Sequence, residues 1–307
     1  DQEFAIAVAA FDRGGDRASD RKAEPGGEFG DLGADLRLQG LVAQHALLQS
    51  RALRLELRLH QRDELRLHYR LQYDIQNQPQ GAEALVRWQH PQRGLVGPSE
   101  FITLAEKSGL IIPLGRWVLR RACEQLAAWA GNPATAHLTM AVNVSAREFR
   151  HPDFIPGLLT TLADTRASPR LLKLELTESL LLEQVDEVIT KMHVLQQRGI
   201  RFALDDFGTG YSSLGYLKIL PLHQIKIDQA FVRDILEDPR DAAIACSIIT
   251  LAHRLGLDVL AEGVETAGQR EFLARNGCQQ FQGHLFGLPA PAEALFPAAQ
   301  EGRTPPV

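Results

Sequence analysis

Residues 171–208 read LLKLELTESLLLEQVDEVITKMHVLQQRGIRFALDDFG and contain a complete strand–helix–strand unit. Leu172–Leu176 and Arg201–Leu204 are short, apolar runs, as expected of buried strands. Val185–Arg198 lies between them and spaces its apolar residues as one face of a helix does, and Gly199 follows it as a helix-ending residue. The stretch therefore predicts two parallel strands joined by a helix.

The same alternation extends over most of the chain. Eight β-rich runs are predicted as strands: Leu65–Tyr73, Gly81–Trp88, Thr139–Val144, Leu172–Leu176, Arg201–Leu204, Gln224–Ile227, Asp258–Leu260 and Phe281–Leu285. Four amphipathic stretches between them are predicted as helices: Phe101–Ala128, Val185–Arg198, Ala242–Leu255 and Ala267–Asn276. Eight strands alternating with helices predict an α/β fold of the TIM (β/α)8-barrel type. An open doubly wound sheet is less favoured, because no Gly-x-Gly-x-x-Gly follows the first strand.

The two ends of the chain differ from this pattern. Residues 1–40 are rich in Gly, Asp, Arg and Glu and predict a flexible leader or linker. Residues 41–63 contain many helix formers and predict a lead-in helix, although Leu53–Leu59 alternates as a strand would. We expect the barrel to span residues 64–296 and a C-terminal tail to cover residues 297–307.

Composition limits the possible partners. The 307 residues include 33 Lys and Arg against 38 Asp and Glu, a formal net charge of −5, so binding to duplex nucleic acid is not expected. Cys123, Cys246 and Cys278 form no pairing framework, which favours a reducing, cytoplasmic location. We find no signal-peptide pattern and no apolar run of 18 residues, so no membrane contact is expected from this segment.

Ionisable or amide side chains stand at the ends of most predicted strands. They are Glu83, Asn143, Glu175, Asp205, Asp206, Lys226, Glu262 and Gln282. Any one of them alone is more often a helix cap or a solvated loop residue. The strands of a barrel end at one mouth, however, and crowded carboxylates there must either raise their pKa values or bind cations. Oxygen ligands without His or Cys favour Mg²⁺ or Mn²⁺, and the adjacent pair Asp205-Asp206 suits two ions that clamp a phosphodiester.

Lys226 lies inside a predicted strand between Ile225 and Ile227, where a purely structural Lys is rare. Beside two metal ions it can orient or deprotonate the attacking water, or stabilise the charge on a phosphate. A Schiff-base nucleophile is the alternative, but it leaves the acidic residues unexplained.

The sequence DFGTGYSSL at residues 206–214 predicts a tight, mobile loop beside the metal ligands. A phosphate-cradling loop is an alternative, although the Walker pattern is absent. We expect Glu265 to hold this loop by accepting hydrogen bonds from its hydroxyl or N–H groups, with Thr209 among the donors.

Taken together, these segments resemble the EAL-domain cyclic di-GMP phosphodiesterases over roughly residues 64–292. The resemblance is carried by Glu83-Ala84-Leu85, Val142-Asn143-Val144-Ser145, Glu175-Leu176-Thr177-Glu178, Asp205-Asp206-Phe207-Gly208-Thr209-Gly210, Lys226-Ile227-Asp228, Glu262-Gly263-Val264-Glu265 and Gln282-Gly283. It implies a modified barrel whose first strand runs antiparallel to the others, and hydrolysis of cyclic di-GMP to linear pGpG. It also implies a homodimer, and a parent protein with a possible upstream sensory or cyclase domain.

The resemblance implies a role for each matching position. Two Mg²⁺ or Mn²⁺ ions per site would be held by Glu83, Asn143, Glu175, Asp205, Asp206 and Glu262. Asp205 would bridge the two ions. The catalytic residues would be Lys226, Glu262 and Glu83, and Lys226 would contact the attacking water. Substrate would be bound by Arg87, Gln282 and Arg70.

Two positions depart from the family pattern. Tyr69-Arg70-Leu71 stands where the family usually has Tyr-Gln-Pro, and an Arg there would serve a phosphate or a guanine edge. His284 replaces the more usual Tyr. Gly26-Gly27-Glu28-Phe29 resembles a fragment of the cyclase signature, but too few residues surround it to form that domain.

Two other functions were weighed against the enzyme. A catalytically silent cyclic di-GMP receptor acting through a protein partner would have lost metal ligands or the loop sequence, and all of these are present here. A general two-metal nuclease would need a basic strip for a longer polymer. The sequence therefore favours the phosphodiesterase.

Overall fold

The computed structural model describes residues 64–178, 180, 184–208 and 214–296 of the chain. The predicted leader at residues 1–40, lead-in helix at 41–63 and tail at 297–307 lie outside the described residues, as does Thr209. All described residues therefore belong to the barrel predicted for residues 64–296.

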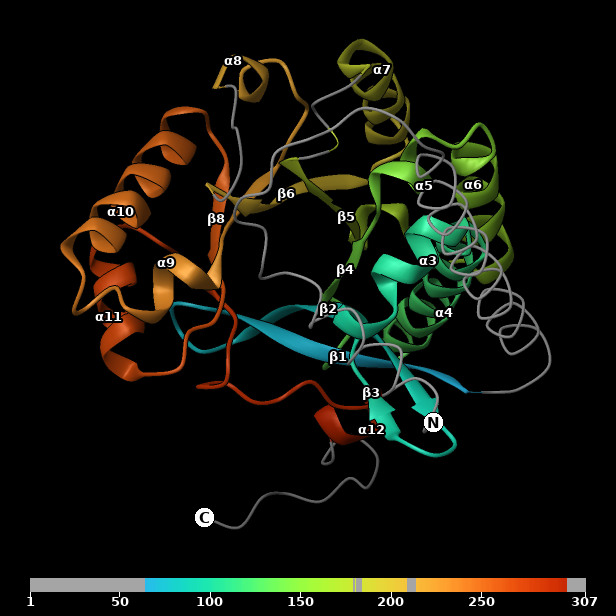
Figure 1. Cartoon of the computed structure of the whole chain (residues 1–307), viewed down its shortest axis with the longest axis horizontal. Helices are drawn as coiled ribbons and strands as arrows, with labels where there is room; N and C mark the ends of the chain where they lie inside the picture. Colours follow the sequence, from blue (N-terminus) through green and yellow to red (C-terminus); the bar gives the residue numbers. More distant parts are fainter. Residues whose placement is uncertain (1–63, 179, 181–183, 209–213, 297–307) are drawn as a thin grey trace, which may run out of the picture. The chain divides into compact units, whose positions relative to one another are not determined.

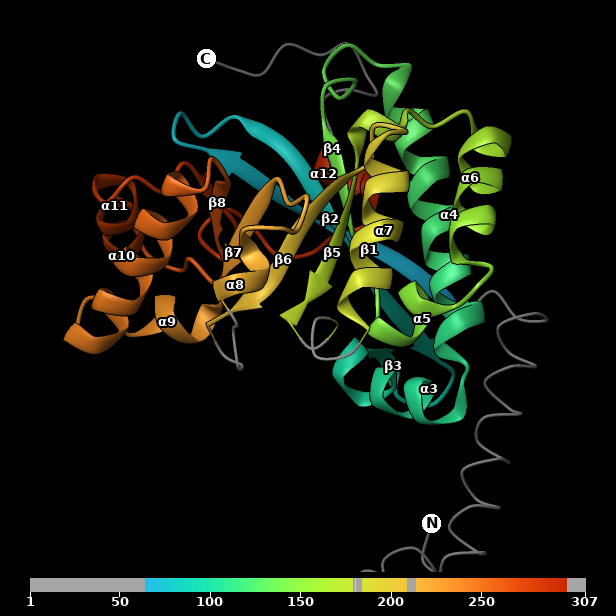
Figure 2. The same ribbon diagram turned by 90° about the horizontal axis from the view of Figure 1, so that it is seen from above.

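Eight strands close into a barrel, which confirms the predicted fold (Figures 1 and 2). They are β1 (Leu65–Asp74), β2 (Pro79–His90), β4 (Thr139–Asn143), β5 (Leu172–Thr177), β6 (Arg201–Phe207), β7 (Gln224–Ile227), β8 (Asp258–Ala261) and β9 (Gln280–Phe281). The short strand β3 (Gly94–Val96) lies outside the barrel and pairs antiparallel with the end of β2. Strand β1 pairs antiparallel with both β2 and β9, and every other pair in the barrel wall is parallel.

Helices cover the outside of this barrel (Figure 2). The α-helices are α3 (Ile102–Ser108), α4 (Ile111–Ala130), α5 (Ala146–Arg150), α6 (Phe154–Thr165), α7 (Val185–Gln196), α8 (Leu214–Leu217), α9 (Gln229–Arg233), α10 (Pro239–Arg254), α11 (Ala267–Arg275) and α12 (Ala292–Leu295). Two 3-10 turns, η1 (Pro98–Glu100) and η2 (Pro169–Leu171), precede α3 and β5. None of the helices in the described part of the chain is long and apolar enough to cross a membrane.

Three of the differences from the sequence expectation have a clear physical reason. The stretch Phe101–Ala128 is two helices rather than one, because the chain adopts a left-handed conformation at Gly109 (φ 82°). The predicted strand Phe281–Leu285 was too long, since β9 ends at Phe281 and the chain then turns at Gly283. Helix α6 was not predicted because it contains Pro156, which is tolerated only because it lies in the first helical turn.

Gly283 lies directly against the backbone of Val264. A Cβ atom built on Gly283 would be 2.1 Å from Val264 O and 2.3 Å from Val264 N. The two segments are also joined by hydrogen bonds, since Val264 N donates to Gln282 O and Leu285 N donates to Val264 O. No side chain fits between them, so the backbone after β8 and the backbone after β9 are held together only if residue 283 is Gly.

We expect Gly283→Ala to lower the free energy of unfolding by about 1–3 kcal/mol, because the added methyl group must push the Val264 backbone away. Urea denaturation followed by circular dichroism measures this loss. The matched control is Gly157→Ala in α6, where an added Cβ meets no atom within 4 Å. Helix propensity should make the control as stable as the parent chain or slightly more stable. Equal stability of the two variants would contradict the close contact.

Candidate active site

The centre of the barrel mouth is the ammonium group of Lys226, which is completely buried. Lys226 Nζ lies 2.7 Å from Glu175 Oε2, 2.9 Å from Asp205 Oδ1 and 2.7 Å from Glu262 Oε1, with Glu83 Oε1 slightly farther at 3.8 Å. These four carboxylates come from the middle of β2, from the carboxyl-terminal parts of β5 and β6, and from the residue after β8. The structure thus brings together the acidic residues that the sequence placed at separate strand ends.

Two amide side chains complete the surroundings of Glu83. Asn143 Nδ2, at the end of β4, donates to Glu83 Oε1 at 2.7 Å. Gln282 Nε2, directly after β9, donates to Glu83 Oε2. Glu83 itself is buried. The two amide donors hold its two carboxylate oxygens, and Lys226 lies near Oε1. Glu175 differs, because its Oε1 atom is buried and has no hydrogen-bond partner within the described part of the chain.

Asp205 and Asp206 face the mouth together because β6 contains a bulge. Leu204 is paired with Ile225 and Phe207 with Ile227, so β6 has one residue more than β7 between these pairs. Asp206 adopts a positive φ of 52°, a conformation that Asp tolerates better than most residues with a side chain. Two successive side chains of a regular strand would instead point to opposite faces.

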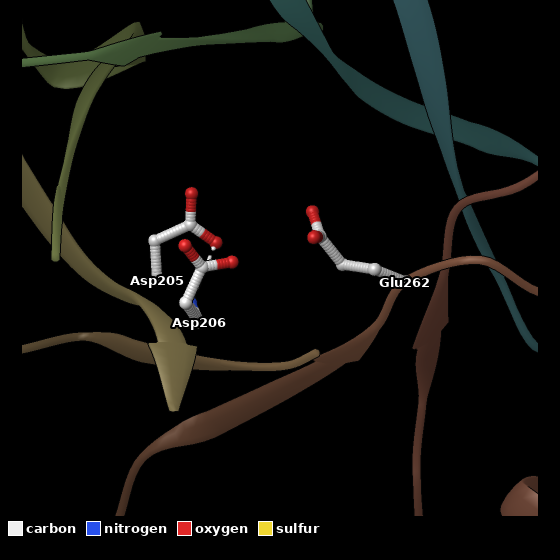
Figure 3. A group of neighbouring side chains, drawn as sticks. All are labelled: Asp205, Asp206 and Glu262. Atoms are coloured by element: carbon white, nitrogen blue, oxygen red, sulfur yellow. Dashed lines mark hydrogen bonds between the residues drawn. The ribbon is translucent and has the colours of Figure 1, made fainter. Parts of the chain in front are cut away.

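Figure 3 shows Asp205 and Asp206 on one side of the opening and the side chain of Glu262 extending toward them. One carboxylate oxygen from each of these three residues lies within 4.8 Å of the others. This spacing allows oxygen atoms from all three residues to contact a single cation.

The electrostatics of the site favour a bound cation. Burial raises the pKa of Glu262 to about 8 and that of Glu175 to about 7, although Lys226 counteracts both shifts. Burial and the neighbouring Asp205 raise the pKa of Asp206 to about 6. Burial alone would lower the pKa of Lys226, but the surrounding carboxylates raise it well above its usual value. One ammonium group is therefore shared among several crowded carboxylates, and divalent cations would relieve the remaining repulsion.

The residues present fit divalent metal ions. The available donors are carboxylate and amide oxygens, the ligand type that Mg²⁺ and Mn²⁺ prefer. Glu175 Oε1 supplies a buried oxygen that lacks a protein partner. The candidate ligands for such ions are Glu83, Asn143, Glu175, Asp205, Asp206 and Glu262.

Two arginines lie beside the acidic group. Arg70 of β1 is the pairing partner of Glu83, and Arg87 of β2 lies farther along the same two strands. Burial lowers the pKa of Arg87, and the nearby positive charge of Arg70 acts in the same direction. Two guanidinium groups close enough to influence each other form a suitable place for a phosphate.

A cavity of about 430 Å³ opens next to Asn143. Its lining is mainly apolar and comes from β2, α3, α4 and the segment after β4, and includes Leu85, Pro98, Ile102 and Val118. A flat aromatic group entering this cavity would lie close to the carboxylates of the mouth.

Glu178 and Glu265, two acidic residues of the sequence motifs, make different contacts. Gly208 N, at the start of the loop after β6, donates to Glu178 Oε1 at 2.9 Å, a contact to which the sequence analysis gave no role. Glu265 Oε1 lies 3.3 Å from His284 Nδ1, and both side chains are more than half exposed. Because Thr209 lies outside the described residues, the proposed contact between Glu265 and this loop stays a prediction.

The sequence analysis also missed a second layer of polar side chains below the carboxylates. Its members are Gln72, Lys173, Gln224 and Gln280, which are joined by hydrogen bonds. Burial lowers the pKa of Lys173 to about 8, and the nearby Glu175 counteracts this shift. The sequence did contain one signal for this layer. Each member lies two positions from a predicted site residue, on the same strand or its direct extension, so the two side chains point to the same face.

The sequence matches the EAL domain family over residues 50–289. It is 44% identical over 237 residues to the bifunctional diguanylate cyclase/cyclic di-GMP phosphodiesterase MucR of Pseudomonas aeruginosa, a match that covers 77% of this chain and 34% of MucR. It is 42% identical over 233 residues to the cyclic di-GMP phosphodiesterase PdeR of Escherichia coli, covering 76% of this chain and 35% of PdeR. The chain thus spans about a third of the length of these curated relatives.

Solved structures agree with this assignment. The PaMucR phosphodiesterase in complex with c-di-GMP is 43% identical and has a TM-score of 0.76, covering 79% of this chain and 98% of that chain. The EAL enzyme Bd1971, bound to cAMP and cyclic-di-GMP, is 32% identical and has a TM-score of 0.79, covering 87% of this chain and 73% of that chain. The barrel with its antiparallel first strand, the group of carboxylates at its mouth and the match over most of its length lead to one conclusion: this chain belongs to the EAL domain family.

Proposed function

We propose that this barrel is a phosphodiesterase that uses two divalent cations, Mg²⁺ or Mn²⁺, to hydrolyse cyclic di-GMP to linear pGpG. The observation that carries the proposal is the convergence of Glu83, Glu175, Asp205 and Glu262 on Lys226 at the barrel mouth. Relatives named as cyclic di-GMP phosphodiesterases, at 42–44% identity, support the choice of substrate.

The bound cations would neutralise charge on the phosphate and make water a stronger nucleophile. The protein side chains have separate roles. Asp205 would hold both ions, and Asp206 would hold one of them. Lys226 Nζ would contact the attacking water and donate a hydrogen bond to it. Glu262 would accept the proton that the water loses.

The substrate is held by groups around this centre. Arg70 and Arg87 contact phosphate oxygens, and the cavity beside Asn143 receives a base. Gln282 is already fixed by Glu83, so its buried Oε1 atom, which has no hydrogen-bond partner in the described part of the chain, can accept a hydrogen bond from water or substrate.

The test is incubation of the chain with cyclic di-GMP and Mg²⁺ or Mn²⁺, followed by chromatography of the products. We expect linear pGpG to accumulate, and we expect EDTA to stop the reaction and excess metal to restore it. Binding of cyclic di-GMP without any product, under all metal conditions, would contradict the proposal and favour the silent receptor.

Two further features remain predictions. A homodimer would need an apolar contact surface, and exposed apolar side chains lie on or near α8 and α10, including Tyr216, Ile219, Leu236 and Ile244. Static light scattering measures the mass that decides this point. A cytoplasmic location, with a sensory or cyclase domain upstream in a longer parent protein, is the setting that we propose for the enzyme.

A further inference from the structure

A chain of hydrogen bonds crosses the barrel interior beneath the candidate active site. Lys173 Nζ donates to Gln224 Oε1 at 2.6 Å and to Gln72 Oε1 at 3.2 Å. Gln224 Nε2 in turn donates to Gln280 Oε1 at 2.8 Å. These four side chains, which we call the cross-barrel brace, connect β1, β5, β7 and β9. In the described structure Gln72 Nε2 has no partner, so Lys173 alone fixes that side chain.

Each member of the brace lies two positions from a candidate site residue on the same strand or its direct extension. The pairs are Gln72 with Arg70, Lys173 with Glu175, Gln224 with Lys226, and Gln280 with Gln282. Side chains two apart on a strand point to the same face, and here that face is the barrel interior. The brace therefore forms the floor directly below four of the site residues.

On β2, Gly81 lies beside the cross-barrel brace. Gly81 is the pairing partner of Gln72, and it lies two positions before Glu83. A Cβ atom at Gly81 would lie 2.3 Å from Thr139 Oγ1 and 3.4 Å from Gln72 Oε1. The close contact with Thr139 thus requires Gly at position 81, whereas Gln72 Oε1 would lie at ordinary van der Waals distance from such a Cβ atom.

Stability alone does not account for Lys173. Its side chain is buried, yet it has no carboxylate within 4.0 Å among the residues that the structure describes, and only two amide oxygens receive its protons. A buried charge without a close counter-charge is costly, and an apolar residue of similar size usually stabilises a fold as well or better. The benefit of Lys173 must therefore lie in the site above it.

We infer that Lys173 is a positioning residue. Through the cross-barrel brace it fixes the positions, along the barrel axis, of the four strands that carry or lead into Arg70, Glu175, Lys226 and Gln282. A shift of one strand would move its site residue relative to the others, and displacements of about 1 Å can reduce turnover by about 100-fold. The role in turnover rests on the proposed phosphodiesterase function, whereas the role in metal binding does not.

The test is a double-mutant cycle of Lys173→Met, Gln224→Met and the double variant. We expect each single change to lower kcat for cyclic di-GMP by about 10-fold to 100-fold, with KM changed less than about 3-fold. The double variant should be no slower than the slower single variant, because both changes break the same brace. Full additivity of the two effects on kcat would overturn the inference.

The affinity of the chain for Mn²⁺ is a second measurement, and it does not depend on hydrolysis of cyclic di-GMP. Gln224→Met leaves the net charge unchanged, so a change in Mn²⁺ affinity reports the positions of the ligands. Isothermal titration should show Mn²⁺ binding weakened by about 10-fold or more, as is usual when a group that supports metal ligands is removed. Unchanged Mn²⁺ affinity would overturn the inference, even if the parent chain proved inactive toward cyclic di-GMP.

Lys191→Met is the matched control. Lys191 on α7 also donates to two oxygens, the backbone oxygens of Phe149 and Arg150, and in addition pairs with Glu187, but it lies outside the barrel interior. The control should keep the kcat and the Mn²⁺ affinity of the parent chain. Circular dichroism checks that each variant folds, and Gln224→Met alone carries the metal test if Lys173→Met does not fold.

Discussion

Replacing Asp205 with Asn is expected to abolish hydrolysis of cyclic di-GMP, with kcat reduced by about 1000-fold or more. The change removes one negative charge from the residue proposed to bridge both cations, and loss of metal-based stabilisation costs several kcal/mol in the transition state. The side chain keeps its shape, so the fold should be preserved. Chromatography of products formed with saturating Mn²⁺ measures the loss.

Asp205 is sensitive because of where the β6 bulge places it. Its Oδ1 atom lies 2.9 Å from Lys226 Nζ, and the same oxygen accepts a hydrogen bond from the backbone N–H of Asp206. Two donors thus orient this oxygen before any ion binds. An Asn side chain can keep only one oxygen in this arrangement, and its NH₂ group would face either Lys226 or a cation.

Asp164→Asn on α6 is the matched control, since Asp164 is exposed and pairs with Arg120 on α4, away from the barrel mouth. It should keep full activity. Isothermal titration with Mn²⁺ adds a second reading, in which Asp205→Asn should show weaker or fewer binding events. Normal turnover by Asp205→Asn in Mn²⁺ would show that the proposed metal site is wrong.

The outline of the fold could be predicted from the sequence because the barrel strands are short and buried. β5, for example, is buried along nearly its whole length, and its run of Leu residues was readable as a strand. The β6 bulge could not be predicted, because one extra residue leaves no trace in the apolar pattern. The break at Gly109 was missed because the apolar spacing continues on both sides of it.

The site was predictable to the extent that strand ends converge in any barrel. Glu83, Glu175 and Asp205 meet Lys226 as that rule requires. The contact between Glu178 and Gly208 was not predictable, because it depends on the path of two loops. The cross-barrel brace was missed for another reason: a Gln or Lys at the start of a strand usually lies in solvent, and only the structure shows that Lys173 and Gln224 are buried.

Lys226→Met is expected to lower kcat by about 100-fold to 10,000-fold, the usual range for a residue that takes part in proton transfer or orients the nucleophile. KM should change much less, because the ammonium group acts on the attacking water rather than on the substrate. Met keeps the length of the side chain and removes its charge. A rise in KM with unchanged kcat would instead assign Lys226 to substrate binding only.

The same variant should also lose stability in EDTA. The ammonium of Lys226 lies within 4.0 Å of four carboxylates, and removing one partner from a buried ion pair typically costs about 3–5 kcal/mol. Mn²⁺ should restore part of this loss, because a ligand that binds only the folded state raises the free energy of unfolding. Urea denaturation of Lys226→Met and of the Lys191→Met control, each with EDTA or Mn²⁺, measures both effects. If Mn²⁺ stabilised neither Lys226→Met nor the control, the carboxylates around Lys226 would not be metal ligands, and the lysine would serve only to neutralise a buried acidic group.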